Sequence, residues 1–239
     1  LGALGGMASY GIAGMFVVWM FSVLWHLRWV QRLPALETLT AADSPANPDA
    51  KPGRCSIIVA ARDEEARIEQ SLRRLLAQRG VDAEFIVVDD RSTDRTSEIL
   101  RGLAKEDARL QVQRVDALPD GWLGKCHACH LGASVATGDW ILVLDADEIL
   151  QPIRPVEFQR MLNDPGAAAY RLRMISAQPG DTDQVEGRVR LFRRLPDVRY
   201  RYPIFERVTP DLADWCARTG QGIFECELAV MHDGCDPER

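Results

Sequence analysis

Charged side chains are missing from residues 1–27, and several common ligand-binding signatures are missing from the whole chain. The 239 residues carry a formal net charge of −6, which argues against a general nucleic-acid-binding protein because such proteins are normally basic. Six cysteines are too few for a disulfide scaffold of this size. Two common phosphate-binding loops are absent: G-x-x-x-x-G-K-[ST] does not occur, and no G-x-G-x-x-G turn follows the first expected strand. If the protein binds a phosphorylated ligand, other residues must contact the phosphate.

The segment without charges is strongly apolar. Its core, YGIAGMFVVWMFSVLWHL, is followed by Arg28 and Arg32. Because roughly 20 apolar residues span a bilayer as a helix, residues 1–30 are predicted to be a transmembrane anchor. A signal peptide and a buried core helix are the alternatives, but a basic n-region and a small-residue cleavage site are not evident. The two arginines predict that everything after residue 28 is cytoplasmic, in a single-pass protein of the inner or plasma membrane.

Residues 31–53 contain prolines and small polar residues and are predicted to be a linker. The chain begins at Leu1 rather than Met and stops at Arg239 within a charged run. We therefore expect a fragment of a longer protein, with further acceptor-side sequence after residue 239.

Short apolar runs alternate with helical patterns after the linker. Strands are predicted at residues 55–61, 84–90, 109–115 and 139–150, with helices within 63–80, 92–106 and 124–138. Asp63 is a candidate N-cap for the first of these helices. Repeated β-α-β units predict an α/β fold with a Rossmann-like, mostly parallel sheet and helices on both faces. Ligands of such folds bind beyond the carboxyl ends of the strands.

Acidic clusters follow two of the predicted strands. Asp145 and Asp147 form a D-x-D pair, in which neighbouring carboxylates repel unless a cation lies beside them. Mg²⁺ or Mn²⁺ bound there would complete its coordination with phosphate oxygens. A solvated loop is the alternative for this pair, and turn and capping chemistry is the alternative for Asp89 and Asp90. Lys125, at a predicted helix N-terminus, is a candidate source of positive charge for phosphate.

The segment Cys126-His127-Ala128-Cys129-His130 matches the C-x-x-C-H pattern that attaches c-type haem. Cys126 and His130 share a helical face, but a zinc site needs further ligands. Haem of this type is attached outside the cytoplasm, whereas the anchor predicts that this segment is cytoplasmic. The pattern is therefore interpreted as a coincidence, with no haem.

Residues 55–150 resemble glycosyltransferase family 2, whose members have the GT-A fold. The resemblance is carried by SIIVAARDEEARIEQSLRRLLAQ, EFIVVDDRSTDRTSEIL and LPDGWLGKCHACHLGASVATGDWILVLDADE. It implies that residues 54–150 form the half of the domain that binds a nucleotide-sugar, with Asp90 at the uracil base and Asp145 and Asp147 at the ribose and the metal-bound diphosphate. Contacts with the donor are also expected from Ala60, Arg62, Asp63, Glu65 and Lys125.

Residues 151–239 are expected to form the acceptor-side half. They resemble a subgroup of the family with an R-x-F-R segment and an I-H-E motif, although Phe205 replaces that histidine here. Glu206 is the candidate catalytic base and Glu148 is its rival, because a base must reach the acceptor hydroxyl. His232 is a candidate metal ligand. Arg190 is a candidate diphosphate ligand, since guanidinium pairs well with phosphate oxygens.

Together these features predict a membrane-anchored, inverting glycosyltransferase that depends on Mn²⁺ or Mg²⁺. The expected reaction moves one sugar, from UDP in the first instance, to a lipid or cell-envelope glycan. The Q-x-x-R-W signature of processive synthases does not occur after the linker, which favours single-sugar transfer. A catalytically inactive nucleotide-binding relative is the main alternative, and a sugar nucleotidyltransferase is disfavoured because its glycine-rich first loop is missing.

Overall fold

The computed structural model describes residues 53–176, 184–195 and 208–232. The predicted anchor, most of the linker and Glu206 lie outside these ranges. Within them, no helix is long and apolar enough to cross a membrane. The elements are β1 (Cys55–Ala61), α2 (Ile68–Leu76), β2 (Ala83–Asp90), α3 (Thr96–Glu106), β3 (Leu110–Val115), α4 (Gly124–Val135), β4 (Trp140–Asp145), β5 (Glu148–Leu150), α5 (Pro155–Asn163), β6 (Ala167–Ser176), β7 (Gln184–Arg193), α6 (Thr209–Thr219) and β8 (Gly222–His232).

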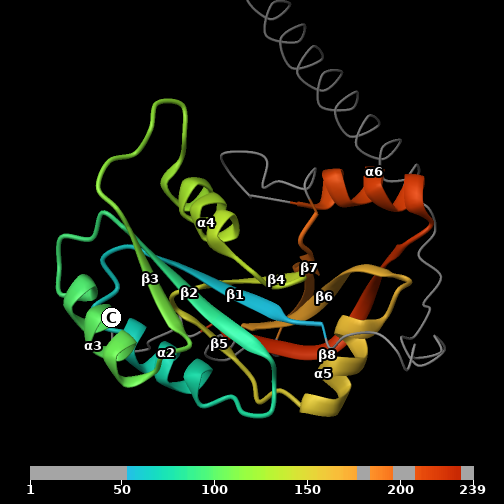
Figure 1. The fold of residues 1–239 in the computed structure, drawn as a ribbon, viewed down its shortest axis with the longest axis horizontal. Coiled ribbons are helices and arrows are strands. Elements are labelled where there is room, and N and C mark those ends of the chain that lie inside the picture. Colours follow the sequence, from blue (N-terminus) through green and yellow to red (C-terminus); the bar gives the residue numbers. More distant parts are fainter. Residues whose placement is uncertain (1–52, 177–183, 196–207, 233–239) are drawn as a thin grey trace, which may run out of the picture. The chain divides into compact units, whose positions relative to one another are not determined.

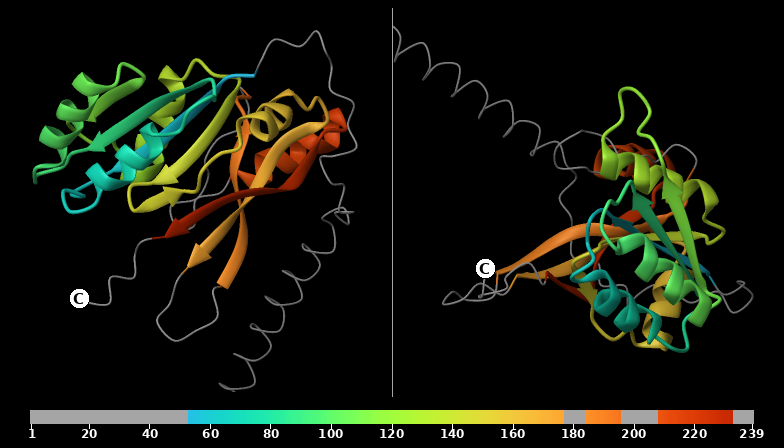
Figure 2. Two further views of the ribbon diagram at one scale, coloured as in Figure 1. Left: turned by 90° about the horizontal axis from the view of Figure 1, so that it is seen from below. Right: turned by 90° about the vertical axis from the view of Figure 1, so that its left-hand side faces the viewer.

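The strands form one sheet in the order β3-β2-β1-β4-β7-β6-β8-β5. The first four of these run parallel to one another, as the β-α-β pattern predicts. Strand β7 pairs antiparallel with both β4 and β6, β8 runs parallel to β6, and β5 pairs antiparallel with β8. Figure 2 shows β6, β7 and β8 as long twisted ribbons beside the parallel strands. The predicted α/β fold is confirmed.

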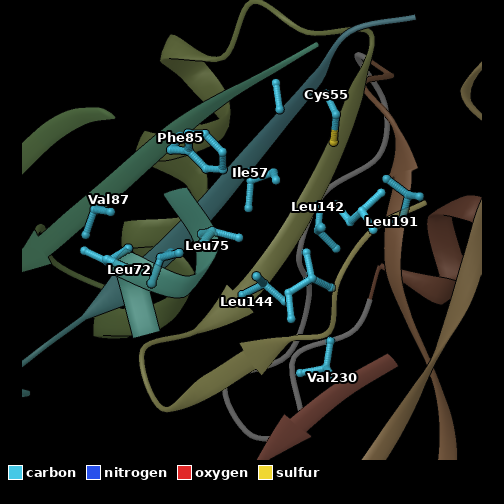
Figure 3. Packing of buried hydrophobic residues seen from close by; sticks show 14 of the residues in the cluster. Cys55, Ile57, Leu72, Leu75, Phe85, Val87, Leu142, Leu144, Leu191 and Val230 are labelled. Atoms are coloured by element: carbon cyan, nitrogen blue, oxygen red, sulfur yellow. The ribbon is translucent and has the colours of Figure 1, made fainter. Parts of the chain in front are cut away.

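Helices cover both faces of the sheet because neighbouring strand residues point to opposite sides. Ile57 packs into a core with α2, α3 and α5, whereas Ile58 packs into a second core with α4 and α6. Figure 1 shows α4 and α6 on one side of the sheet and α2, α3 and α5 on the other. In the first core, Leu72 and Leu75 of α2 lie against the side chains of β1 and β2 (Figure 3).

Two predicted elements differ from the structure. The apolar run 139–150 forms two strands, because the chain turns at Ala146–Asp147 after β4 and β5 pairs with β8 at the far edge of the sheet. Asp63 is not the N-cap of the first helix: α2 begins at Ile68 and its N-cap position is Arg67. The carboxylate of Asp63 instead accepts a hydrogen bond from the backbone N–H of Thr93, at 2.7 Å.

Candidate donor-binding site

Several of the predicted site residues lie at the carboxyl edge of the parallel strands. Ala60, near the end of β1, is in register with Val88 on one side and Asp145 on the other. Ala61 is in register with Asp89. The two acidic clusters therefore lie on either side of the end of β1, where open α/β sheets bind their ligands.

The turn after β1 is fixed against the segment that follows β2. Three consecutive backbone N–H groups, those of Asp63, Glu64 and Glu65, donate hydrogen bonds to side chains of residues 92, 96 and 94, at 3.0, 2.8 and 3.0 Å. Asp63 has a φ of +53°, a left-handed conformation that Asp tolerates better than most residues. Arg62 is exposed and lies 3.8 Å from the carboxylate of Asp63. This turn is thus held in one shape before any ligand binds.

Asp89 and Asp90 have different surroundings. Asp89 accepts hydrogen bonds from the Ser92 N–H at 3.1 Å and from Arg114 at 2.6 Å, and it also contacts the Ser97 hydroxyl. Burial alone would raise the pKa of Asp89, but these hydrogen bonds and the Arg114 charge hold it below its usual range. Asp89 therefore stabilises the loop after β2 through these hydrogen bonds.

Asp90, the predicted base-binding residue, is 4% exposed. The guanidinium of Arg91 donates to both of its carboxylate oxygens, at 2.8 and 3.0 Å. The N-terminus of α4 approaches the same carboxylate so closely that a Cβ on Gly124 would lie 2.3 Å from Asp90 Oδ2. Glycine at position 124 is required by this approach.

Asp145 is held by two cations. Lys125 Nζ lies 2.7 Å from Asp145 Oδ1, and Arg190 Nη2 lies 3.3 Å from Asp145 Oδ2. Burial would raise the pKa of Asp145, but Arg190 and Lys125 keep it below its usual range. Lys125, the candidate source of positive charge for phosphate, thus lies beside the first carboxylate of the D-x-D pair.

Glu148, the rival candidate base, is 5% exposed. One of its oxygens accepts from Arg190 at 2.7 Å, and the other accepts from the backbone N–H of Asp145 at 2.8 Å. Burial raises the pKa of Glu148 although the Arg190 charge opposes that shift. Arg190 is itself 8% exposed, so its guanidinium lies among carboxylates rather than at the surface.

Asp147 is partly exposed, with 23% of its side chain accessible, and Arg67 Nη1 lies 3.8 Å from its carboxylate. The pKa of Glu64 is raised, first by burial and then by the charge of Asp147. Glu64, Asp145 and Asp147 therefore concentrate negative charge at this end of the site, which Arg67 partly offsets. A divalent cation would relieve it, and Mg²⁺ typically binds one or two carboxylates together with substrate phosphates.

No group of three or more His, Cys, Asp or Glu side chains in the described ranges is arranged to hold a metal ion by itself. The carboxylates of Asp145 and Asp147 are oxygen ligands of the kind that a divalent cation takes together with a diphosphate. His232 ends β8, where its backbone is in register with Glu148. Its side chain, like all of Glu206, lies outside the described part of the structure.

The C-x-x-C-H segment forms the first two turns of α4. Cys126 and Cys129 are buried, and Cys129 packs into the core between α4 and the sheet. Trp122, just before the helix, contacts the rings of His127 and His130, with centroid distances of 5.3 and 4.9 Å. The interpretation of the motif as a coincidence stays a prediction.

Two arginines of the site were not predicted. Arg91 pairs with Asp90, and Arg67 lies near Asp147. Arg91 directly follows β2 and has a φ of +60°. The sequence does not predict this left-handed backbone conformation, so the pairing of Arg91 with Asp90 became visible only in the structure. Charge alone could not single out Arg67, because the helical segment around it is rich in arginine.

The chain matches known glycosyltransferases in sequence. The 4,4'-diaponeurosporenoate glycosyltransferase of Staphylococcus haemolyticus is 40% identical over 92 residues, which cover 38% of this chain and 24% of that protein. A succinoglycan biosynthesis protein of Rhizobium meliloti is 30% identical over 176 residues, which cover 64% of this chain and 47% of that protein. The chain thus spans less than half the length of either relative.

Solved structures share the fold. A mannosyltransferase of Pyrobaculum calidifontis in complex with GDP-Man and Mn²⁺ superposes with a TM-score of 0.60 at 20% identity, covering 95% of this chain and 68% of that one. TarS of Staphylococcus aureus in complex with UDP-GlcNAc also has a TM-score of 0.60, at 16% identity, covering 74% and 58% of the two chains. The model of the family described as "Glycosyl transferase family 2" matches residues 56–216, more than half of the chain, and the chain therefore belongs to that family.

Proposed function

We propose that this protein transfers a single sugar from a nucleotide-sugar, in the first instance a UDP-sugar, to a lipid or cell-envelope glycan acceptor. The observation that carries the proposal is the convergence of Asp90, Lys125, Asp145 and Asp147 at the carboxyl edge of the sheet. The fold alone does not define a function, so the proposal also depends on membership of glycosyltransferase family 2. The names of the two relatives support a lipid or envelope acceptor.

The proposed reaction is an inverting displacement. An acceptor oxygen forms a bond to the anomeric carbon while the bond from that carbon to the diphosphate breaks, and the nucleoside diphosphate leaves with the electron pair. Glu206 takes the proton of the acceptor hydroxyl. Asp90, together with the Arg91 guanidinium that pairs with both of its oxygens, sets the position of the uracil base. Lys125 places positive charge where the leaving group develops negative charge.

Mn²⁺ or Mg²⁺, held by Asp147 with Asp145 beside it and His232 as a further ligand, would supply charge neutralisation at the diphosphate. The chemistry of the donor set fits such an ion, since carboxylate oxygens and phosphate oxygens are the ligands that these cations prefer. Residues 1–30 anchor the protein in the inner or plasma membrane, with the transferase domain on the cytoplasmic side.

A transfer assay tests this proposal. Labelled UDP-glucose, UDP-N-acetylglucosamine and GDP-mannose are incubated with the protein, Mn²⁺ and bacterial membrane extract. Label that enters the organic phase indicates a lipid acceptor, and label in the insoluble envelope fraction indicates a glycan. Asp147→Ala should abolish the signal, whereas Arg173→Met, an exposed position on β6, should not. Wild-type rates for Asp147→Ala would refute the metal assignment.

An inactive nucleotide-binding relative remains the second candidate. The replacement of the motif histidine by Phe205 favours it. Such a protein would bind a nucleoside diphosphate yet transfer no label from any donor to either fraction.

A further inference from the structure

Arg190 lies where strands β4 and β7 separate. The antiparallel ladder between them pairs residues 140–142 with 193–191, and Arg190 is the next residue along β7. Beyond that point β4 continues to Asp145, the chain turns, and Glu148 begins β5, the edge strand next to β8. Backbone pairing with β7 therefore does not extend to the D-x-D turn.

Side chains connect the strands where the ladder stops. Arg190 Nη2 reaches Glu148 Oε1 at 2.7 Å and Asp145 Oδ2 at 3.3 Å. Glu148 Oε2 accepts from the Asp145 backbone N–H at 2.8 Å. Glu148 thus holds the backbone of Asp145 while Arg190 holds its carboxylate, and the pair fixes both ends of that residue.

This geometry differs from what a base or a diphosphate ligand requires. A general base needs an oxygen within reach of the acceptor hydroxyl, but both Glu148 oxygens have partners and the residue is 5% exposed. A diphosphate ligand needs donors that face the ligand, but Arg190 is 8% exposed and points at two carboxylates. Buried charges of this kind are normally paired and are costly to separate.

We infer that Arg190 and Glu148 are positioning residues, which act together through Asp145 to set the D-x-D turn and thereby the donor site. This inference rests on the proposed function. It assigns the direct donor and metal contacts to Asp145 and Asp147, and it leaves the role of base to a residue other than Glu148.

Calorimetry with Mn²⁺ measures the binding of a nucleoside diphosphate and of the matching monophosphate. The comparison separates a positioning role of Arg190 from a direct diphosphate contact. A positioning role predicts that Arg190→Met weakens both nucleotides about tenfold, because Asp145 loses its support at the ribose. Arg190→Lys should recover part of that loss. A diphosphate contact instead predicts that Arg190→Met weakens the diphosphate alone, and this result would overturn the inference.

Glu148→Gln is the matching test for the partner. A positioning role predicts weaker nucleotide binding and a parallel fall in sugar transfer, whereas a catalytic base predicts wild-type binding with no transfer. The double variant Glu148→Gln/Arg190→Met should bind no more weakly than the worse single variant, because the pair acts as a unit. Losses that multiply in the double variant would contradict the inference. Arg173→Met, which removes an exposed ion pair on β6, should leave binding unchanged.

Unfolding of each variant in urea controls for loss of the fold. If the wild-type protein binds no nucleotide, the proposed function itself fails. The coupling of Arg190 and Glu148 is then read from the unfolding free energies of the single and double variants. Non-additive losses would still support a mutually dependent buried pair, and additive losses would overturn it.

Discussion

Replacing Gly124 with Ala tests whether the approach of α4 to Asp90 shapes the donor site. The added Cβ would lie 2.3 Å from Asp90 Oδ2 and 3.0 Å from Arg91 Nη2, well inside van der Waals contact. Restoring an ordinary separation needs a movement of about 1 Å, since carbon contacts prefer 3.5–4.0 Å. Asp90 has little freedom to move, because it is 4% exposed and both of its oxygens are bonded to Arg91.

The expected stability cost of Gly124→Ala is that of overpacking, about 1–3 kcal/mol. A misplacement of about 1 Å can cost an active site about 100-fold in rate, equivalent to about 2.8 kcal/mol. We therefore expect a loss of nucleotide affinity of up to this size, comparable with the loss of stability. Calorimetry measures the affinity, and urea denaturation measures the free energy of unfolding.

Gly102→Ala is the matched control. Gly102 lies in α3, and a Cβ there would meet nothing within 4 Å. This variant should gain about 0.5–1 kcal/mol of stability, because Ala is the better helix former, and its nucleotide affinity should not change. If Gly124→Ala also keeps wild-type affinity and stability, the reasoning about the close approach is wrong.

Three further predictions concern the packed core, the Glu84 carboxylate and the C-x-x-C-H segment. Gly132→Ala should lower the free energy of unfolding by about 1–3 kcal/mol, because its Cβ would lie 2.6 Å from Ile58 Cγ2 in a packed core; an unchanged urea midpoint would contradict this. Burial alone would raise the pKa of Glu84, but hydrogen bonds from Ser56 and Thr137 keep it below its usual 4.5. The contribution of this carboxylate to stability is therefore complete above about pH 4.5 and is lost as the pH falls through the lowered pKa. The difference in unfolding free energy between wild type and Glu84→Gln should accordingly shrink on acidification from pH 7 to pH 3, and a constant difference would refute this. The purified protein should show no haem absorption band near 400 nm, and a stoichiometric band would overturn the reading of Cys126–His130 as an ordinary helix.

Three of the parallel strands, β1, β2 and β4, were predictable because they are buried on both faces and appear as short, largely apolar runs. The predicted strand at residues 55–61 coincides with β1, and the prediction for 84–90 is one residue shorter than β2. The apolar run at residues 139–150 was wrongly predicted to be one strand, whereas it forms β4 and β5. No glycine or proline marks the turn at Ala146–Asp147, and β5 pairs with β8, which lies far away in sequence.

The donor-site carboxylates were predictable for a topological reason. Parallel strands bring their carboxyl ends to one edge, so Asp90 and Asp145 were expected at the same edge once the strands were assigned. The pairing of Arg190 with Glu148 was not predictable. It depends on where the ladder between β4 and β7 stops, and no local pattern in the sequence encodes that position.

The central claim is a metal-dependent donor site at this edge. Calorimetric titration of UDP, GDP and their sugar conjugates into residues 51–239, with and without Mn²⁺, tests it most directly. The account predicts that one nucleotide binds only in the presence of Mn²⁺ and that Asp147→Ala removes this binding. Binding of no nucleotide by the folded protein, or binding that is indifferent to both Mn²⁺ and Asp147→Ala, would contradict it.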